Sequence, residues 1–354
     1  MRLRLAAGAA AVAFSVAVLA SPDDPVPLPE PEVPAVEVLA EDLEAPSAVA
    51  VHGDRAFVTE RAGLVRVVQD GSLLEAPLAS FRPAAVPGGG LLGIALDPEF
   101  AENGRLYLYM TYEEGGDLYN RIMAVTESGS RLRDVETILD GIPGSAYTNG
   151  GFLKFGPDGM LYAGTGTVSE GSHLPSDPAS LAGKILRIGA DGSIPADNPF
   201  PGSPVYSLGY RNPQGLAWDE EGRMYAADLG PEKNDEINLV RAGSDHGWPG
   251  TECAAGPGTE AALACYDPSI EPGGMIHYSG RIDVGFPLLV ASLKASNLYG
   301  VDPWSGSESP VLGFNGRVRD VAQGDDGSIY VITSNTDGRG FPDAGDDRLL
   351  RITR

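Results

Sequence analysis

One pattern recurs along the chain: a turn that contains glycine is followed by a short apolar segment with an aromatic residue in it. These segments span residues 53–60, 103–112, 158–166, 221–230 and 326–334. Their aromatic residues are Phe57, Tyr107, Tyr162, Tyr225 and Tyr330. Short apolar runs bounded by glycine turns are typical of β-strands. A sixth apolar segment, residues 286–293, fills the long gap before the last one but lacks the turn.

A second predicted strand follows each of the six segments, at residues 63–69, 121–127, 184–189, 236–242, 297–303 and 348–354. Six all-β units of roughly 50 residues predict a six-bladed β-propeller, in which neighbouring units bury each other's faces. The end strands of a ring need partners, so we expect residues 348–354 to pair with a strand near Val36 to Val51. A two-sheet sandwich is the alternative, but it accounts less well for the regular repeat.

The first 37 residues differ in composition from the rest. Residues 1–20 have a basic start, a short apolar run and small residues at the end, which predicts a cleaved secretory signal and a cell-exterior or periplasmic protein. The run is short for a membrane span, and an uncleaved anchor is the alternative. Residues 21–37 contain six prolines and predict an extended spacer. The predicted propeller domain covers residues 38–354, with no membrane span in the mature chain.

Charge and cysteine content narrow the function classes. The formal net charge is −24, and so acidic a surface repels the phosphates of nucleic acids. The only two cysteines are Cys253 and Cys265, and in an exported protein we expect them to form a disulfide. Two free thiols are the alternative, and a zinc site is poorly supported because no second Cys or His pair lies nearby.

The stretch from Gly209 to Asn238 carries candidate chemistry. Arg211 and Asn212 stand before one predicted strand, and their side chains suit an anionic ligand. Gly230 and Pro231 follow that strand, where free backbone carbonyls near carboxylates suit calcium. Read alone, these segments are also compatible with ordinary turns.

Longer motifs favour the functional interpretation. GYRNPQGLAW, DLGPEKNDEINLV and GSDHGWP occur in this order, together with GGGLLGIALDPEF, NGGFLKFGPDGMLYAGTG, DPASLAGKILRIGADGSIPADNPF and GRVRDVAQGDDGSIYVIT. On these motifs, residues 38–354 resemble the glucose/sorbosone dehydrogenase family of soluble quinoprotein aldose sugar dehydrogenases. The resemblance implies the propeller fold, the cofactor pyrroloquinoline quinone (PQQ), calcium, a small-molecule sugar substrate and an external electron acceptor.

The resemblance also assigns residues. The positions that match the family's cofactor contacts are Arg211, Asn212, Lys294, Arg317 and Arg319. Strand alternation sends the last two side chains to one face, and the alternative for each cation is a solvated surface position. The carbonyls of Gly230 and Pro231 match a calcium site beside the quinone, and Glu236 with the backbone of His246 matches a second, structural calcium. The alternative for Asp235 and Glu236 is a pair of exposed turn acids.

The sequence departs from the family at the catalytic base. Where the family has Asp-His-x-Gly-Gly-Arg-Leu, this chain has Tyr147, Thr148 and, further on, Phe152. Thr148 occupies the base position, and a hydroxyl of unperturbed pKa is no general base at neutral pH. The family's polar residue before GLLG is Gly88 here, and its usual acid after the DGMLYAGTG strand is Thr167. His173, in the next loop, is a candidate replacement base, although a lone loop histidine is more often solvated.

Three functions fit these observations. The first is a PQQ- and calcium-dependent oxidoreductase acting on aldoses, with activity reduced or lost at Thr148. The second is a non-catalytic propeller that binds a ligand or a cell-surface partner, which the missing histidine supports. The third is a calcium-dependent lactone hydrolase on a similar fold, which the dehydrogenase motifs disfavour.

Overall fold

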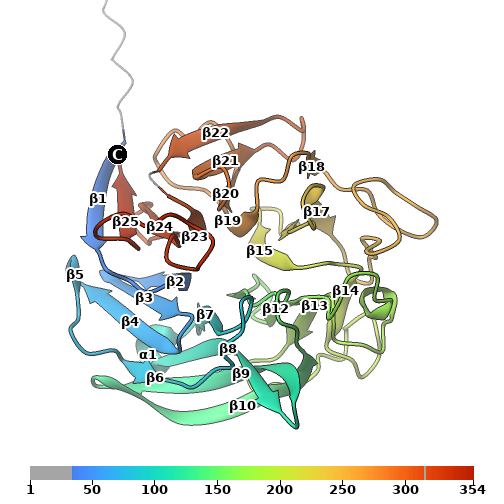
Figure 1. Cartoon of the computed structure of the whole chain (residues 1–354), viewed down its shortest axis with the longest axis horizontal. Coiled ribbons are helices and arrows are strands. Elements are labelled where there is room, and N and C mark those ends of the chain that lie inside the picture. Colours follow the sequence, from blue (N-terminus) through green and yellow to red (C-terminus); the bar gives the residue numbers. More distant parts are fainter. Residues whose placement is uncertain (1–33, 315) are drawn as a thin grey trace, which may run out of the picture. The chain divides into compact units, whose positions relative to one another are not determined.

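The computed structural model describes residues 34–314 and 316–354, so the predicted signal peptide and most of the predicted spacer lie outside the described residues. Within this range the chain forms six antiparallel sheets arranged around a common axis (Figure 1). The prediction of a six-bladed β-propeller is therefore confirmed. None of the helices in this part of the chain is long and apolar enough to cross a membrane.

The first three blades follow one another along the chain. Blade 1 contains β2 (Pro46–His52), β3 (Arg55–Glu60), β4 (Leu64–Gln69), β5 (Ser72–Leu73) and β6 (Ala79–Ser80), and both β5 and β6 pair with β4. Blade 2 contains β7 (Leu91–Leu96), α1 (Phe100–Asn103), β8 (Arg105–Glu114), β9 (Asp117–Ser128) and β10 (Arg131–Pro143). Blade 3 contains β11 (Leu153–Phe155), β12 (Leu161–Thr165), the 3-10 helix η1 (Leu174–Ser176), β13 (Lys184–Ile188) and β14 (Val205–Leu208).

The last three blades repeat the order of four strands. Blade 4 contains β15 (Pro213–Trp218), β16 (Met224–Asp228), β17 (Asp235–Val240) and β18 (Ala264–Tyr266). Blade 5 contains β19 (Pro272–His277), β20 (Leu288–Ser292), β21 (Asn297–Val301) and β22 (Glu308–Gly313). Blade 6 contains β23 (Val318–Gln323), β24 (Ile329–Thr333), β25 (Leu349–Thr353) and, as its outermost strand, β1 (Ala35–Ala40).

The first strand of the chain closes the ring. β1 pairs antiparallel with β25, from Ala35 opposite Thr353 to Ala40 opposite Leu349. This confirms that the C-terminal strand pairs with a strand near Val36 to Val51. β1 begins inside the range 21–37 where we expected the spacer, because closure gives its backbone a hydrogen-bonding partner.

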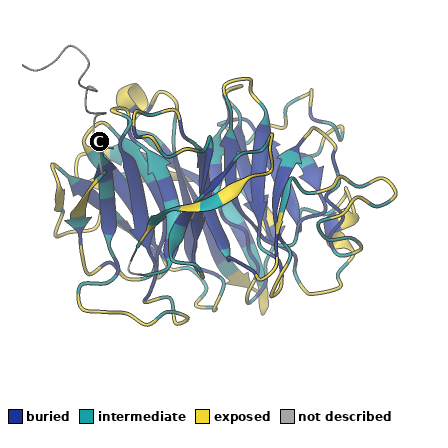
Figure 2. Ribbon diagram, turned by 90° about the horizontal axis from the view of Figure 1, so that it is seen from above, coloured by how far each residue is buried: buried dark blue, intermediate teal, exposed yellow. Residues whose placement is uncertain are grey.

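The recurring pattern of the sequence corresponds to the middle of each blade. The six apolar segments form the second strands β3, β8, β12, β16, β20 and β24, and the strands that follow them are the third. The aromatic rings of Phe57, Tyr107 and Tyr225 are completely buried between blades. Figure 2 shows the buried residues within the strands and the exposed ones in the loops.

The predicted disulfide is present between Cys253 and Cys265, whose Cα atoms lie 5.7 Å apart. It ties the long loop after β17 to β18. The backbone N–H of Cys253 donates a hydrogen bond to the carboxylate of Glu236 (2.5 Å), so this loop also covers a buried acid.

Candidate functional site

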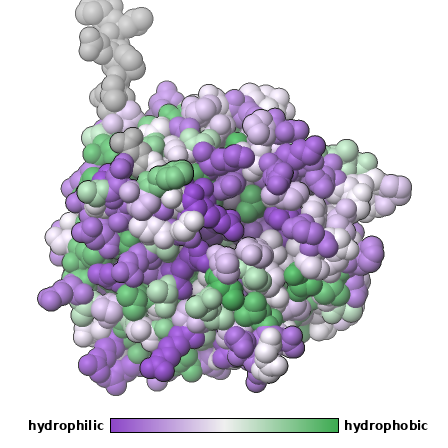
Figure 3. Space-filling model, viewed as in Figure 1, coloured by the Kyte–Doolittle hydropathy of each residue, from purple (hydrophilic) through white to green (hydrophobic). Residues whose placement is uncertain are grey.

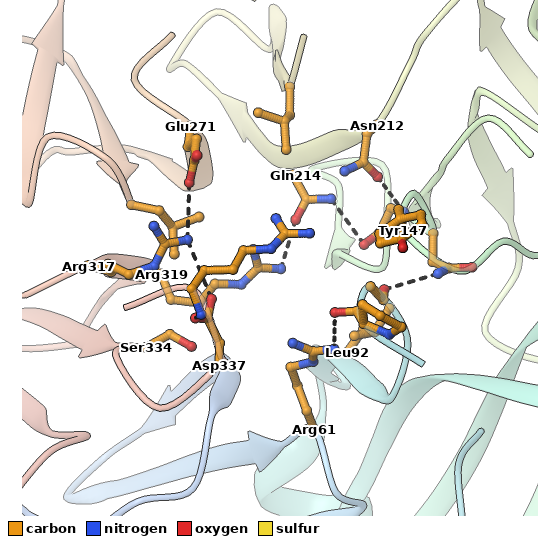
Figure 4. A pocket seen from close by; sticks show the side chains of 17 residues that line it. Arg61, Leu92, Tyr147, Asn212, Gln214, Glu271, Arg317, Arg319, Ser334 and Asp337 are labelled. Atoms are coloured by element: carbon orange, nitrogen blue, oxygen red, sulfur yellow. Dashed lines mark hydrogen bonds and ion pairs between the residues drawn. The ribbon is translucent and has the colours of Figure 1, made fainter. Parts of the chain in front are cut away.

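The loops before the first strand and after the second strand of each blade lie at one end of the axis, because neighbouring strands are antiparallel. They enclose an open pocket of about 730 Å³. A narrower recess joins it on the axial side, and Tyr147, Asn212, Leu229, Glu271 and Arg339 line both. Hydrophilic side chains surround the hollow on this face (Figure 3). Figure 4 shows the recess from close by.

Arg317 and Arg319 both line the recess, as expected (Figure 4). The reason differs in part from the strand alternation we proposed. Arg317 lies just before β23, and the pairing of that strand is irregular between Val318 and Asp320. The guanidinium of Arg317 contacts two carboxylates, Glu271 at 3.0 Å and Asp337 at 3.4 Å. Its charge is therefore balanced within the protein.

The guanidinium of Arg319, in contrast, contacts no carboxylate among the described residues. It donates to the Gln214 amide oxygen (2.7 Å) and to the Ser47 carbonyl (3.3 Å), and neither acceptor carries a charge. Burial, and to a lesser extent the nearby guanidinium of Arg61, lowers the pKa of Arg319 to about 10. A half-buried cation that donates only to neutral acceptors favours an anionic ligand.

Arg211 and Asn212 are held by a buried acid that the sequence reasoning missed. Asp228, at the end of β16, accepts hydrogen bonds from the backbone N–H groups of both residues (2.9 and 2.7 Å). Burial, and then the charge of Glu236, raises the pKa of Asp228 to about 7. The guanidinium of Arg211 contacts Glu170 at 2.7 Å in the larger pocket. The Asn212 side chain accepts from the N–H of Gly150 (2.9 Å).

Three further cations line the same two cavities. Lys294 follows β20 and is exposed in the larger pocket. Arg61 and Arg339, which the sequence reasoning missed, line the recess. Arg61 donates to the carbonyls of Val86 and Gly89, each at 3.1 Å. Burial lowers the pKa of Arg61. Both arginines lie in loops that follow the second strand of a blade, as Gly230 does. Comparing the equivalent loops of the repeated blades could have identified them from the sequence.

The four predicted cofactor cations and Asn212 therefore converge on one end of the propeller. All five line connected cavities, which favours a shared ligand site over unrelated surface positions, and Lys294 is the one that is exposed. The five residues come from blades 4, 5 and 6, which follow one another along the chain and pack side by side around the axis.

The Gly230–Pro231 turn lines the larger pocket, as expected. The Gly230 carbonyl accepts a hydrogen bond from Arg211 (2.8 Å), and the Gly230 N–H donates to Asp235 (2.9 Å). Among the described residues, no group of three or more His, Cys, Asp or Glu side chains is placed to hold a metal ion. A cation beside this turn would depend mainly on backbone carbonyls, which are good calcium ligands.

The second predicted calcium position is interior. Asp235 and Glu236 are buried, so the alternative that they are exposed turn acids is wrong. Glu236 accepts from the Asn238 amide (2.9 Å), while the buried amide oxygen of Asn238 has no partner. The N–H of His246 donates to the Leu208 carbonyl (2.9 Å). A buried carboxylate next to an unpaired amide oxygen suits a hard cation.

The expected base position contains no base. The Thr148 hydroxyl is buried and donates to the Thr167 carbonyl (2.5 Å), and it also contacts the Ser145 hydroxyl at 3.0 Å. A hydroxyl that already donates its proton to a neutral carbonyl has no group to activate it. His173 is exposed at the start of η1 and does not line the pocket or the recess.

The other departures from the family have packing consequences. The backbone of Gly88 lies against Tyr147, and a Cβ at Gly88 would be 2.1 Å from the Tyr147 carbonyl oxygen, so a polar side chain does not fit there. The Phe152 ring lies over Gly164, where a Cβ would be 2.2 Å from it. Tyr147 itself is 64% exposed and lines both cavities.

Together, the fold and the site define a β-propeller that gathers cations in a pocket at one end of its axis. The chain belongs to the glucose/sorbosone dehydrogenase family, whose model matches residues 43–351. The resemblance drawn from the motifs is thereby confirmed.

Among its relatives, the chain is 31% identical over 345 residues to the aldose sugar dehydrogenase of Escherichia coli, covering 86% of this chain and 91% of that protein. It is 34% identical over 189 residues to the quinoprotein glucose dehydrogenase B of Acinetobacter calcoaceticus, covering 45% of this chain and 40% of that one. The PQQ-bound aldose sugar dehydrogenase of Streptomyces coelicolor has the same fold, with a TM-score of 0.80 and 35% identity over 91% of this chain and 98% of that one.

Proposed function

We propose that this protein binds PQQ and calcium at the mouth of the propeller and acts on the hydroxyl of an aldose, passing electrons to an external acceptor. The convergence of Arg211, Lys294, Arg317 and Arg319 on connected cavities carries the proposal. A quinone that carries several carboxylates needs several cations, and this chain concentrates them here although its net charge is −24. The PQQ-bound relative supports the choice of cofactor.

When bound, the quinone supplies a hydride acceptor and calcium supplies a Lewis acid. The residues of the chain itself bind and orient the cofactor. Arg319 and Lys294 have no carboxylate partner among the described residues, so their charges are available to the cofactor. Asp228 fixes the backbone of Arg211 and Asn212, which positions both side chains toward the pocket. The carbonyls of Gly230 and Pro231 are the proposed ligands of the ion beside the cofactor.

Export belongs to the same proposal. Residues 1–20 read as a secretory signal and residues 21–37 as a spacer, and the Cys253–Cys265 disulfide favours an oxidising compartment. Glu236, with the backbone of His246, is proposed to hold a structural calcium, since the unpaired Asn238 oxygen lies beside that acid.

A second function is favoured by one observation: the Thr148 hydroxyl donates its proton to a carbonyl. Without a base, proton removal from the sugar is slow, because acid–base assistance is worth about a hundredfold to ten-thousandfold in rate. A non-catalytic propeller that binds an anionic ligand would need the cations and not the base. Since the family is one of dehydrogenases, a lactone hydrolase is not pursued.

The test is a titration of the calcium-loaded protein with PQQ, followed by dye reduction with a panel of aldoses. Trp248 lies 5.7 Å from the Arg211 guanidinium, so its fluorescence is expected to report binding. Arg319→Gln is expected to weaken PQQ binding about ten- to a hundredfold, the range for charge-assisted hydrogen bonds. Arg241→Gln, at an exposed arginine outside these cavities, is the control. Binding without any dye reduction would favour the non-catalytic function, and no binding would refute both.

A further inference from the structure

Two cations at the rim of the pocket remain unpaired. Neither the Lys294 ammonium nor the Arg339 guanidinium has a hydrogen-bond or ion-pair partner among residues 34–314 and 316–354. The backbone of Arg339 is fixed, because its N–H donates to the carboxylate of Asp337 (2.8 Å). That carboxylate also contacts Arg317, so it is shared between two residues of the recess. The free guanidinium of Arg339 thus extends from an anchored point of the loop between β24 and β25.

Arg339 and Tyr147 line both cavities, which places them where the recess opens into the larger pocket. The Tyr147 ring is 64% exposed, whereas its backbone is fixed: the N–H donates to the Ser145 hydroxyl (3.2 Å), and Gly88 packs against its carbonyl. An exposed ring on a fixed backbone offers a flat apolar surface at low entropic cost. Such a surface fits the apolar face of a pyranose ring.

The polar groups of this mouth favour an acceptor-rich ligand. The two positions at which the resemblance leads us to expect acids are Tyr147 and Thr167. Three of the four acids that line these cavities are engaged, Glu170 by Arg211, and Glu271 and Asp337 by Arg317, while Glu232 at the edge of the larger pocket contacts no cation among the described residues. The hydroxyl donors of a neutral sugar would therefore find few unpaired carboxylates here. The Arg339 guanidinium and the Lys294 ammonium, in contrast, are unpaired within the part of the chain that the structure describes.

We infer that the sugar recognised here carries a carboxylate, as in a hexuronic acid, with Tyr147 packing against its ring and Arg339 binding its carboxylate. This inference rests on the proposed function for the location of the sugar. It assigns specificity to two residues that lie outside the predicted cofactor contacts. Lys294 is left for the cofactor, so Arg339 is the free cation that distinguishes an acidic sugar from a neutral one.

The test compares two ligands that differ only at C6, D-galacturonate and D-galactose. Binding of each is measured by calorimetry on the calcium-loaded protein, with and without PQQ, and dye reduction is measured in parallel. Galacturonate is expected to bind about two- to fivefold more tightly, the upper part of the range for an ion pair at an exposed site. Arg339→Gln removes this preference without changing the affinity for PQQ, and 0.5 M salt reduces it.

The matched control is Arg241→Gln, whose guanidinium is exposed on blade 4 and contacts only Glu260, at 3.4 Å. This variant keeps the preference. Equal binding of the two sugars, or a preference that survives Arg339→Gln, would overturn the inference. Loss of PQQ affinity in Arg339→Gln would reassign this residue to the cofactor. Because calorimetry is also run without PQQ, failure of cofactor binding refutes the proposed function and still leaves the sugar preference decided.

Discussion

Arg319 offers a prediction in which stability and ligand binding change in opposite directions. Its guanidinium is held by the Gln214 amide and the Ser47 carbonyl, which are neutral, and like-charged Arg61 lies nearby. In the ligand-free protein this charge is therefore a cost of folding. Replacing Arg319 by Gln is expected to stabilise the ligand-free protein and to weaken the binding of an anionic cofactor.

The magnitude follows from the pKa. Burial lowers the pKa of Arg319 to about 10, whereas the ordinary value for arginine is about 12.5. Each pKa unit corresponds to about 1.4 kcal/mol, so the charged form costs about 3 kcal/mol. Since the lowered pKa belongs to a basic group, this cost is complete at any pH below about 10. Loss of the hydrogen bond to Gln214 offsets about 1 kcal/mol, which leaves a net gain of about 1 to 2 kcal/mol.

Arg187 is the contrasting control. Its guanidinium is also buried, but it contacts Asp158 at 2.9 Å and Asp197 at 2.8 Å. Arg187→Gln is expected to destabilise the protein, because it removes a buried guanidinium that contacts two carboxylates, the partly exposed Asp158 and the exposed Asp197. Urea unfolding at pH 7.5, followed by tryptophan fluorescence, measures both variants. If Arg319→Gln destabilises the ligand-free protein as much as Arg187→Gln does, Arg319 is a structural residue and the reasoning fails.

Three further predictions concern other parts of the chain. Replacing Cys253 and Cys265 by Ser is expected to cost about 3 kcal/mol in the free energy of unfolding, because a short loop is released, and an unchanged urea midpoint would contradict this. Burial lowers the pKa of Lys184 to about 7, so between pH 7 and 10 the unfolded chain binds a proton that the native protein lacks. The free energy of unfolding of the natural protein, measured relative to Lys184→Met, should therefore rise from pH 7 to pH 9. A difference that stays constant over this range would refute the prediction. Thr148→His is expected to raise sugar oxidation by about a hundredfold or more once PQQ is bound, whereas rapid turnover that Thr148→Ala leaves unchanged would place the base elsewhere.

The parts of the fold that could be predicted from sequence are those with local signals. All residues of β12, β16, β20 and β24 are buried, so they read as mainly apolar runs, and all but β20 follow a glycine turn. The first strands gave a weaker signal. β11 has only three residues. The first strands of all six blades meet around the axis, where their side chains pack against residues of other blades.

The same limit applies to the site. Arg211 and Arg317 could be found because each lies within a long motif. Arg61 and Arg339 lie in loops without a comparable motif. Arg339 belongs to blade 6 itself, whereas Arg61 in blade 1 lies next to blade 6 because β1 closes the ring with β25. Asp228 was missed for another reason. Its carboxylate accepts hydrogen bonds from two backbone N–H groups, and no pattern of residues in the sequence predicts that this carboxylate is buried.

Cation binding and proton transfer depend on different loops in this propeller. The predicted cofactor residues extend from blades 4, 5 and 6, whereas Thr148 lies in the loop between β10 and β11. Thr148 contacts Ser145 in the same loop and Thr167 in the loop after β12, and neither contact involves a cation of the pocket. Loss of the histidine therefore need not disturb the groups that hold an anion. Because the Thr148 side chain contacts none of the predicted cofactor residues, the proton-transfer group can change while the binding residues keep their positions.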